Sequence, residues 1–363
     1  MTTVQHSIMP IENIDDWNMR LARQDAFWQN AIIDRPVIHL TYPRTPAPAK
    51  PPEKNFASHR ERWLDSEYQA ALALHRVEST VYAGDALPMA FPNLGPEVFS
   101  AWFGTPMEYG ETTSWSIPNL KNWDEVDQIK FDRENFYWKK MWEMTEALLE
   151  FGKGKFYVGY TDIHPGGDAI AAFRDPQQLN LDLIEVPEKV IALREAIDTV
   201  FCEIFTEITS WLRDERHQAI CSWPAIVSTK RYHVPSNDFS CMISPKMFRD
   251  YFLPGIIQEC RSAEANVYHL DGPNALRHLD ALLEVPEINA IQWVFGAGNG
   301  TPKDWLHVYK RCQEAGKGLQ ISPPVSDLPV LVENLDPHGV WLGVRARDRD
   351  EADYVMDLIS RWH

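Results

Sequence analysis

The stretch ANVYHLDGPNALRHLDALLEVPEINAIQWVF, residues 265–295, contains one complete strand–helix–strand unit and sets the expectation for the fold. It begins with a short apolar run and passes through a turn that contains Gly and Pro. It then continues as an amphipathic helix over 273–284 and ends in a second apolar run. Two parallel strands joined by a helix are the repeating unit of α/β proteins. The stretch therefore predicts an α/β fold.

The same alternation recurs along the chain. Strands are predicted at 36–41, 79–91, 156–160, 219–227, 265–270, 290–295, 319–322 and 340–344. Helices are predicted at 57–80, 131–152, 187–213, 245–262, 273–284, 302–315, 326–334 and 349–361. Strands that alternate with helices in this number favour a (β/α)8 TIM barrel. An open doubly wound sheet would give a similar rhythm, but no GxGxxG follows any strand.

The proline-rich segment at 43–54, PRTPAPAKPPEK, is the clearest interruption of this pattern. Proline is excluded from helix interiors and central strands, so we expect an extended surface loop there. The loop interrupts the barrel without marking a domain boundary. We therefore expect one domain over 1–363, with an N-terminal helical extension at 1–35.

Composition narrows the classes of partner. The net charge is −17 and no basic run concentrates positive charge, which argues against nucleic acid. No apolar run approaches the roughly 20 residues needed to cross a bilayer, and the N-terminus does not resemble a secretion signal. The five cysteines are scattered and never spaced as CxxC, as expected of reduced thiols. These features predict a soluble cytoplasmic protein that acts on a small molecule.

In a TIM barrel, the residues that follow each strand gather at one mouth and form the active site. His269 and Asp271 end one predicted strand, and alternate residues of a strand point the same way. A divalent metal such as Zn²⁺ could accept both side chains, or the carboxylate could orient the imidazole as a general acid or base. A hydrogen bond that only fixes the loop is the structural alternative. His269 and Asp271 are the predicted metal ligands.

Asp162 and His164 repeat the same spacing after another predicted strand, so their loop is expected to converge on the same point. His164 precedes Pro165 and could instead only shape a turn. Asp238 could face a ligand or cap a helix. The candidate catalytic residues are therefore His269, Asp271, Asp162, His164 and Asp238.

Aromatic side chains near the strand ends offer surfaces on which a substrate could stack. The sequence holds 14 tryptophans, and core packing is the structural alternative for each of them. The candidate substrate-binding residues are Tyr160, Trp115, Trp223, Trp293 and Arg345.

Four segments resemble the uroporphyrinogen decarboxylase superfamily, which includes corrinoid-dependent methyltransferases. They are YTDIHPGGD at 160–168, SPKMFRDYFLP at 244–254, YHLDG at 268–272 and LGVR at 342–345. The resemblance implies a barrel with its site at the C-terminal mouth and a methyltransferase acting on a small methylated substrate, either a methoxy compound or a methylamine. It also implies a corrinoid on a separate carrier protein and Zn²⁺ or another divalent metal. A homodimer is a further expectation.

The chain departs from the family pattern in two places. The arginine-rich N-terminal segment of true uroporphyrinogen decarboxylases is mostly missing at 35–44, which argues against haem biosynthesis. The family's methyltransferases bind zinc through His-x-Cys and a distant Cys. Here His269 and Asp271 fill the first motif, and Val344 and Arg345 stand where the second thiolate is expected. A site without thiolates suits an oxygen substrate or water better than a thiol.

Two other functions stay open. One is a decarboxylase, lyase or sugar-processing enzyme that uses Asp162, Asp238, His164 and His269 as acid–base groups. The other is a non-catalytic binding protein.

Overall fold

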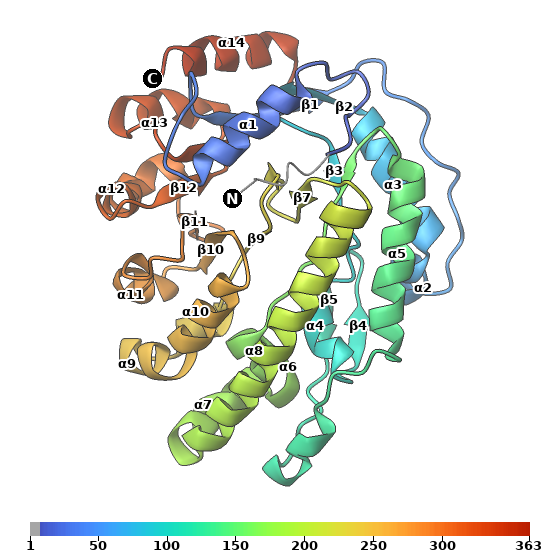
Figure 1. Cartoon of the computed structure of the whole chain (residues 1–363), viewed down its shortest axis with the longest axis vertical. Helices are drawn as coiled ribbons and strands as arrows, with labels where there is room; N and C mark the ends of the chain where they lie inside the picture. Colours follow the sequence, from blue (N-terminus) through green and yellow to red (C-terminus); the bar gives the residue numbers. More distant parts are fainter. Residues whose placement is uncertain (1–7) are drawn as a thin grey trace.

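The computed structural model describes residues 8–363 and shows a mixed α/β fold (Figure 1). Its strands are β1 (Val37–Pro43), β2 (Thr80–Gly84), β3 (Met89–Ala90), β4 (Met107–Tyr109), β5 (Ser114–Ser116), β6 (Tyr157–Val158), β7 (Ile220–Cys221), β8 (Val227–Ser228), β9 (Tyr232–His233), β10 (Ala265–Asp271), β11 (Ala290–Val294), β12 (Gly318–Ile321) and β13 (Val340–Arg345). Seven of them form one sheet in the order β2-β1-β13-β12-β11-β10-β9. Only β2 pairs antiparallel within this sheet.

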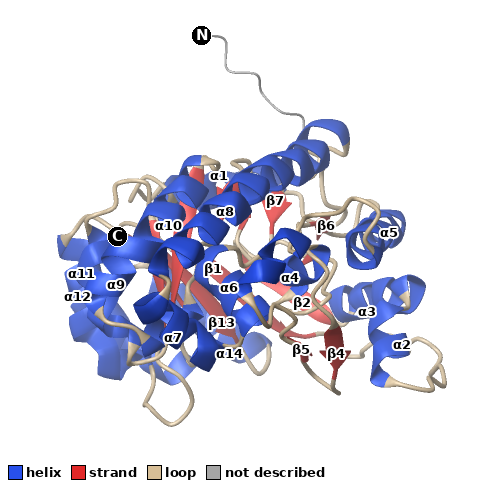
Figure 2. Cartoon of the chain, turned by 90° about the horizontal axis from the view of Figure 1, so that it is seen from below, coloured by secondary structure: helices blue, strands red, loops and turns tan. Residues whose placement is uncertain are grey.

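Helices surround the strands, as seen from below in Figure 2. They are α1 (Trp17–Phe27), α2 (His59–Leu64), α3 (Ser66–Glu78), α4 (Val98–Trp102), α5 (Phe136–Gly152), α6 (Gly166–Arg174), α7 (Pro176–Glu185), α8 (Pro187–Ser210), α9 (Pro245–Met247), α10 (Leu253–Arg261), α11 (Leu279–Leu283), α12 (Leu306–Glu314), α13 (Leu328–Asn334) and α14 (Arg349–Ser360). Figure 1 shows α10 to α14 along one side of the strands and α3 and α5 along the other. No helix within residues 8–363 is both long enough and apolar enough to span a membrane.

The short strands β3, β6 and β7 extend the arrangement beyond the large sheet. β3 pairs parallel with β6, and the Tyr160 N–H donates to the carbonyl of Cys221, the last residue of β7, at 3.1 Å. Gly159 allows this close approach, because a Cβ there would lie 2.1 Å from the Cys221 oxygen. The ladders within residues 8–363 form four separate sheets, so the fold is TIM-barrel-like without a continuous ring of pairing.

Two predicted elements are divided in the structure. The helix expected over 57–80 breaks at Asp65, whose extended backbone ends α2 and whose carboxylate accepts the Tyr68 N–H at the start of α3. The strand expected over 219–227 becomes β7 and the antiparallel β8, because a turn containing Pro224 and Ala225 separates them. In the expected N-terminal extension, residues 1–7 lie outside the described part and the remainder contains α1.

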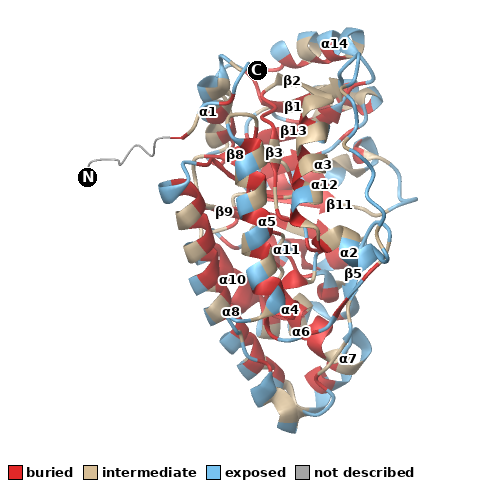
Figure 3. Ribbon diagram, turned by 90° about the vertical axis from the view of Figure 1, so that its right-hand side faces the viewer, coloured by how far each residue is buried: buried red, intermediate tan, exposed pale blue. Residues whose placement is uncertain are grey.

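The strands of the large sheet and one face of many helices are coloured as buried in Figure 3, so the core lies where the helices pack on the strands. On α8, apolar residues recur at helical spacing on one face, and Val190, Ile197, Phe201 and Ile204 are all buried there. The core also contains a buried ion pair.

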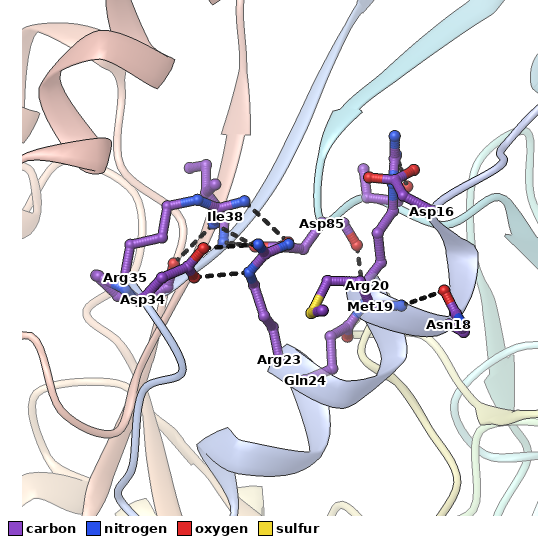
Figure 4. A network of polar contacts seen from close by, with 12 residues as sticks. Asp16, Asn18, Met19, Arg20, Arg23, Gln24, Asp34, Arg35, Ile38 and Asp85 are labelled. Atoms are coloured by element: carbon purple, nitrogen blue, oxygen red, sulfur yellow. Dashed lines mark hydrogen bonds and ion pairs between the residues drawn. The ribbon is translucent and has the colours of Figure 1, made fainter.

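That ion pair joins Arg23 of α1 and Arg35, which precedes β1, to Asp85, which follows β2 (Figure 4). Asp85 is fully buried and accepts hydrogen bonds from Arg35 at 2.5 and 3.0 Å, from Arg23 at 3.2 Å and from the Ile38 N–H at 3.0 Å. Arg23 also binds Asp34, which contributes most to raising the pKa of its guanidinium. Several donors satisfy the buried carboxylate, which is the condition under which such a charge is tolerated.

Candidate active site

A cluster of one imidazole and two carboxylates lies at the carboxyl end of β10. His269 and Asp271 occupy alternate positions of this strand, and Asp238 begins the short 3-10 turn over Asp238–Met242. One ligand atom from each of the three residues lies within 4.8 Å of the other two. The structure thus brings together three of the five candidate catalytic residues.

The position of Asp238 depends on a second carboxylate. Asp168, in the first turn of α6, accepts hydrogen bonds from the Asp238 N–H at 3.1 Å and the Phe239 N–H at 2.9 Å. Asp168 therefore caps the turn, and the alternative that Asp238 is itself the cap does not apply. The Asp238 carboxylate is left to face the cluster, with 51% of its side-chain surface exposed.

A row of amides sets the orientation of the His269 ring. His269 Nδ1 lies 2.5 Å from Gln292 Oε1, and the Gln292 amide donates to Gln320 Oε1 at 2.7 Å. The Gln320 amide in turn donates to Ser322 Oγ at 3.3 Å. With the amides assigned this way, Nδ1 carries the proton. Burial lowers the pKa of His269, so the ring is neutral near pH 7 and its Nε2 lone pair faces the carboxylates.

The cluster fits a divalent cation. A neutral imidazole nitrogen and two carboxylate oxygens form a three-ligand set of the kind that catalytic metal sites use, and a histidine ligand commonly donates its other N–H to an oxygen. The set contains no thiolate. The nearby thiol, Cys241, stays protonated, since burial and the carboxylates of Asp238, Asp168 and Asp271 raise its pKa. Zn²⁺ or a harder ion would be bound by nitrogen and oxygen alone.

Asp162 and His164 form a second pair that adjoins the cluster. His164 Nε2 lies 2.7 Å from Asp162 Oδ1, and Nδ1 lies 2.5 Å from Ser236 Oγ, which itself donates to Asp168 at 3.1 Å. Burial lowers the pKa of His164, but the charges and hydrogen bond of Asp162, with Asp168 and Asp238, outweigh it and raise the pKa to about 10. His164 is therefore a buried imidazolium near neutral pH, rather than only a turn residue.

Charges from the cluster at the end of β10 and from the Asp162–His164 pair both change the pKa of the Asp238 carboxyl group. Burial and the neighbouring Asp168 raise its pKa, His164 lowers it, and Asp271 and Asp162 raise it again, to about 7 in all. Water screens part of this repulsion, because half of the side chain is exposed. All five candidate catalytic residues thus belong to one electrostatically linked group.

The candidate substrate-binding residues are more dispersed. Trp223 meets the His269 ring edge to face at 5.1 Å and lines a cavity of about 580 Å³. Trp293 packs on Trp305, is 4% exposed and lines a smaller cavity with Gln292, Gln320 and Ser322. Tyr160 is buried, and its hydroxyl donates to the Tyr232 carbonyl. Trp115 lies exposed on the β4–β5 hairpin, and Arg345 lines a third cavity.

Sequence reasoning missed four residues that organise the site, namely Asp168, Ser236, Gln292 and Gln320. Gln292 lies opposite His269 in the parallel register of β10 and β11, and Gln320 lies opposite Gln292 in that of β11 and β12. Polar residues at matching positions of neighbouring apolar strands were the available signal. Ser236 gave no such signal.

No family model and no curated protein matches the chain. Among solved structures, a methyltransferase from Methanosarcina mazei is similar, with a TM-score of 0.58 and 12% sequence identity. The match covers 94% of this chain and 96% of that one. The two chains share a fold. This confirms, at the level of the fold, the resemblance predicted from the four sequence segments.

Proposed function

We propose that the chain is a methyltransferase-like enzyme that removes a methyl group from a small methoxylated compound or methylamine. The acceptor in this proposal is a corrinoid on a separate carrier protein. The observation that carries the proposal is the Asp238–His269–Asp271 cluster, which offers three ligand atoms within 4.8 Å at the mouth of a fold shared with a methyltransferase. Parallel α/β folds place their active sites at this end of the strands.

Different residues of the chain have different roles in this proposal. Asp238, His269 and Asp271 would hold a divalent ion, which would supply Lewis acidity toward the oxygen or nitrogen that bears the methyl group. The reduced corrinoid would supply the electron pair of the new bond to the methyl group, the electron pair of the broken bond would stay on that oxygen or nitrogen, and this atom would take up a proton from water. The His164 imidazolium stabilises the negative charge that develops there, because it is already ordered by Asp162 and Ser236.

A decarboxylase or lyase is the second candidate. The observation that favours it is the group of perturbed pKa values, with His164 raised to about 10 and Asp238 to about 7. Groups whose pKa values are shifted by their neighbours are typical of acid–base catalysis. In this function, Asp238 would exchange a proton with the substrate and His164 would bind the carboxylate that is lost.

Metal analysis and a transfer assay test the first proposal together. We expect purified protein to contain about one divalent ion per chain, and His269→Ala to lose it. His338→Ala is the matched control, because His338 also pairs with an aspartate, Asp336, but on the exposed surface. With a reduced corrinoid carrier, the wild type should methylate the corrinoid from methoxylated substrates or methylamines. Protein that holds no metal and transfers no methyl group from any of them would refute the proposal.

A further inference from the structure

Three arginines line a cavity at the carboxyl ends of β1 and β13, which β12 and β11 separate from β10 in the sheet. The cavity has a volume of about 590 Å³ and lies where β1, β13 and the end of α3 meet. Arg44 follows β1, Arg345 ends β13 and Arg76 lies in the last turn of α3. The register of β1 and β13 sets Thr41 opposite Arg345, so these groups share one level of the sheet.

These arginines differ from most of the others in the chain. The protein carries a net charge of −17, and most of its arginines form ion pairs with the abundant carboxylates. Within residues 8–363, Arg44, Arg76 and Arg345 form no ion pair, and no acidic residue lines the cavity. Arg44 is steadied by the carbonyls of Glu78 and Thr80. Unpaired guanidinium groups that converge on one cavity are suited to bidentate recognition of oxyanions.

One residue that lines the cavity is a neutral histidine. His39 lines it, stacks on Trp341 at 5.5 Å and has a buried Nδ1 without a hydrogen-bond partner in the described chain. Burial lowers the pKa of His39 to about 4, so the ring is neutral and can bond to a ligand. A buried nitrogen without a partner is costly unless a ligand or water satisfies it. The cavity volume lies within the range of about 300–1,000 Å³ that small-molecule sites occupy.

Two sets of neighbouring residues lie between the cavity and the cluster at His269. Arg76 and Met89 line both this cavity and the neighbouring one, whose wall includes Trp223, the residue in edge contact with His269. From the other side, the amide row that starts at His269 ends at Ser322. A Cβ on Gly343 would lie 3.1 Å from its Oγ. Gly343 shares a face of β13 with Arg345, because the two are alternate residues.

We propose that Arg44, Arg76 and Arg345 bind the carboxylate or phosphate group of a small molecule in this cavity. The site deepens the proposed function, since a methylated substrate anchored by its anionic end would extend past Trp223 toward the Asp238–His269–Asp271 cluster. Anion binding itself requires neither a metal nor methyl transfer.

Calorimetric titration of the full chain tests the proposal with four probes. They are 4-methoxybenzoate, its neutral analogue 4-methoxybenzamide, phenyl phosphate and inorganic phosphate. We expect at least one of the anions to bind, and its affinity to fall as ionic strength rises. Binding of the carboxylate, but not of either phosphate, would assign the site to carboxylates, and the reverse result would assign it to phosphates. The neutral amide should bind at least about 10-fold more weakly than the carboxylate if the latter binds.

Single substitutions locate the site. Arg345→Gln and Arg76→Gln should each weaken anion binding about 10-fold or more, because each removes a charged hydrogen-bond donor. Arg347→Gln is the matched control, since it removes the same charge two residues away, where Arg347 pairs with exposed Glu351. Thermal melting of each variant checks that it is folded, and all three arginines are exposed enough for the fold to tolerate the change.

Three results would overturn the anion site: no heat with any of the anions, equal binding of the amide and the acid, or equal weakening by Arg345→Gln and Arg347→Gln. Failure of the methyl-transfer proposal is recognised separately, by metal content and corrinoid methylation. If the protein binds anions through Arg345 but contains no metal and transfers no methyl group, the anion site is supported and the methyl-transfer proposal is refuted.

Discussion

Gln292→Leu is predicted to weaken metal binding at His269 although Gln292 would not touch the ion. In the wild type, Gln292 Oε1 accepts the Nδ1 proton of His269 at 2.5 Å and its amide donates to Gln320 at 2.7 Å. Leucine has a similar size but removes both bonds, so the His269 ring loses the contact that fixes its tautomer and angle. Loss of such an outer contact typically costs about 10–100-fold in metal affinity, or about 1.4–2.7 kcal/mol.

The assay is a competition for Zn²⁺ between the protein and a coloured chelator at pH 7.5. Gln292→Glu is a second variant, because its carboxylate keeps the acceptor for Nδ1–H and should preserve or tighten binding. Gln313→Leu is the control, since Gln313 also makes two hydrogen bonds, both to the Asp336 backbone, but on the exposed surface. If Gln292→Leu binds Zn²⁺ as tightly as the wild type, the amide row does not orient the ligand and the reasoning is wrong.

Two further predictions concern stability. Asp85→Ala leaves Arg35 buried without its carboxylate and should lower the free energy of unfolding by about 3–5 kcal/mol, as measured by urea denaturation. The control is Asp34→Ala, because Arg23 loses one carboxylate partner in that variant but still pairs with Asp85. The folded-state pKa of His164 is raised from 6.5 to about 10, so its stabilising contribution is complete below about pH 6.5 and is lost as the pH rises toward 10. The difference in melting temperature between wild type and His164→Gln should therefore shrink from pH 6 to pH 10, and a constant difference would contradict the assigned charge.

The sequence predicted the second half of the fold more closely than the first. β10, β11, β12 and β13 lie within a residue or two of their expected positions, because each is a continuous apolar run bounded by turn residues. Before β10, the strands β3 and β6 contain only two residues each, and β4, β5 and β9 were not predicted. Such strands are held by single close contacts, as at Gly159 and Cys221, and leave no periodic pattern.

In the candidate site too, local features could be predicted from the sequence and contacts between distant segments could not. The spacing of His269 and Asp271 predicted that their side chains lie close together, since the geometry of one strand decides it. The addition of Asp238 could not be predicted in the same way. Its place depends on Asp168, which is 70 residues away in the chain and holds the turn through two backbone N–H groups. Contacts between distant loops require the folded topology, which a local pattern does not contain.

The amide row from His269 to Ser322 has a consequence for anyone who transplants this site to another barrel. Every bond in the row points the same way, so reversing a single amide would leave two donors or two acceptors facing each other. A grafted Asp–His–Asp trio without the three supporting side chains would leave the imidazole free to present either nitrogen. The smallest portable version of the site therefore includes four neighbouring strands, β10 to β13, since Gly343 leaves room for the serine that ends the row, together with the Asp238 turn and the Asp168 carboxylate that holds it.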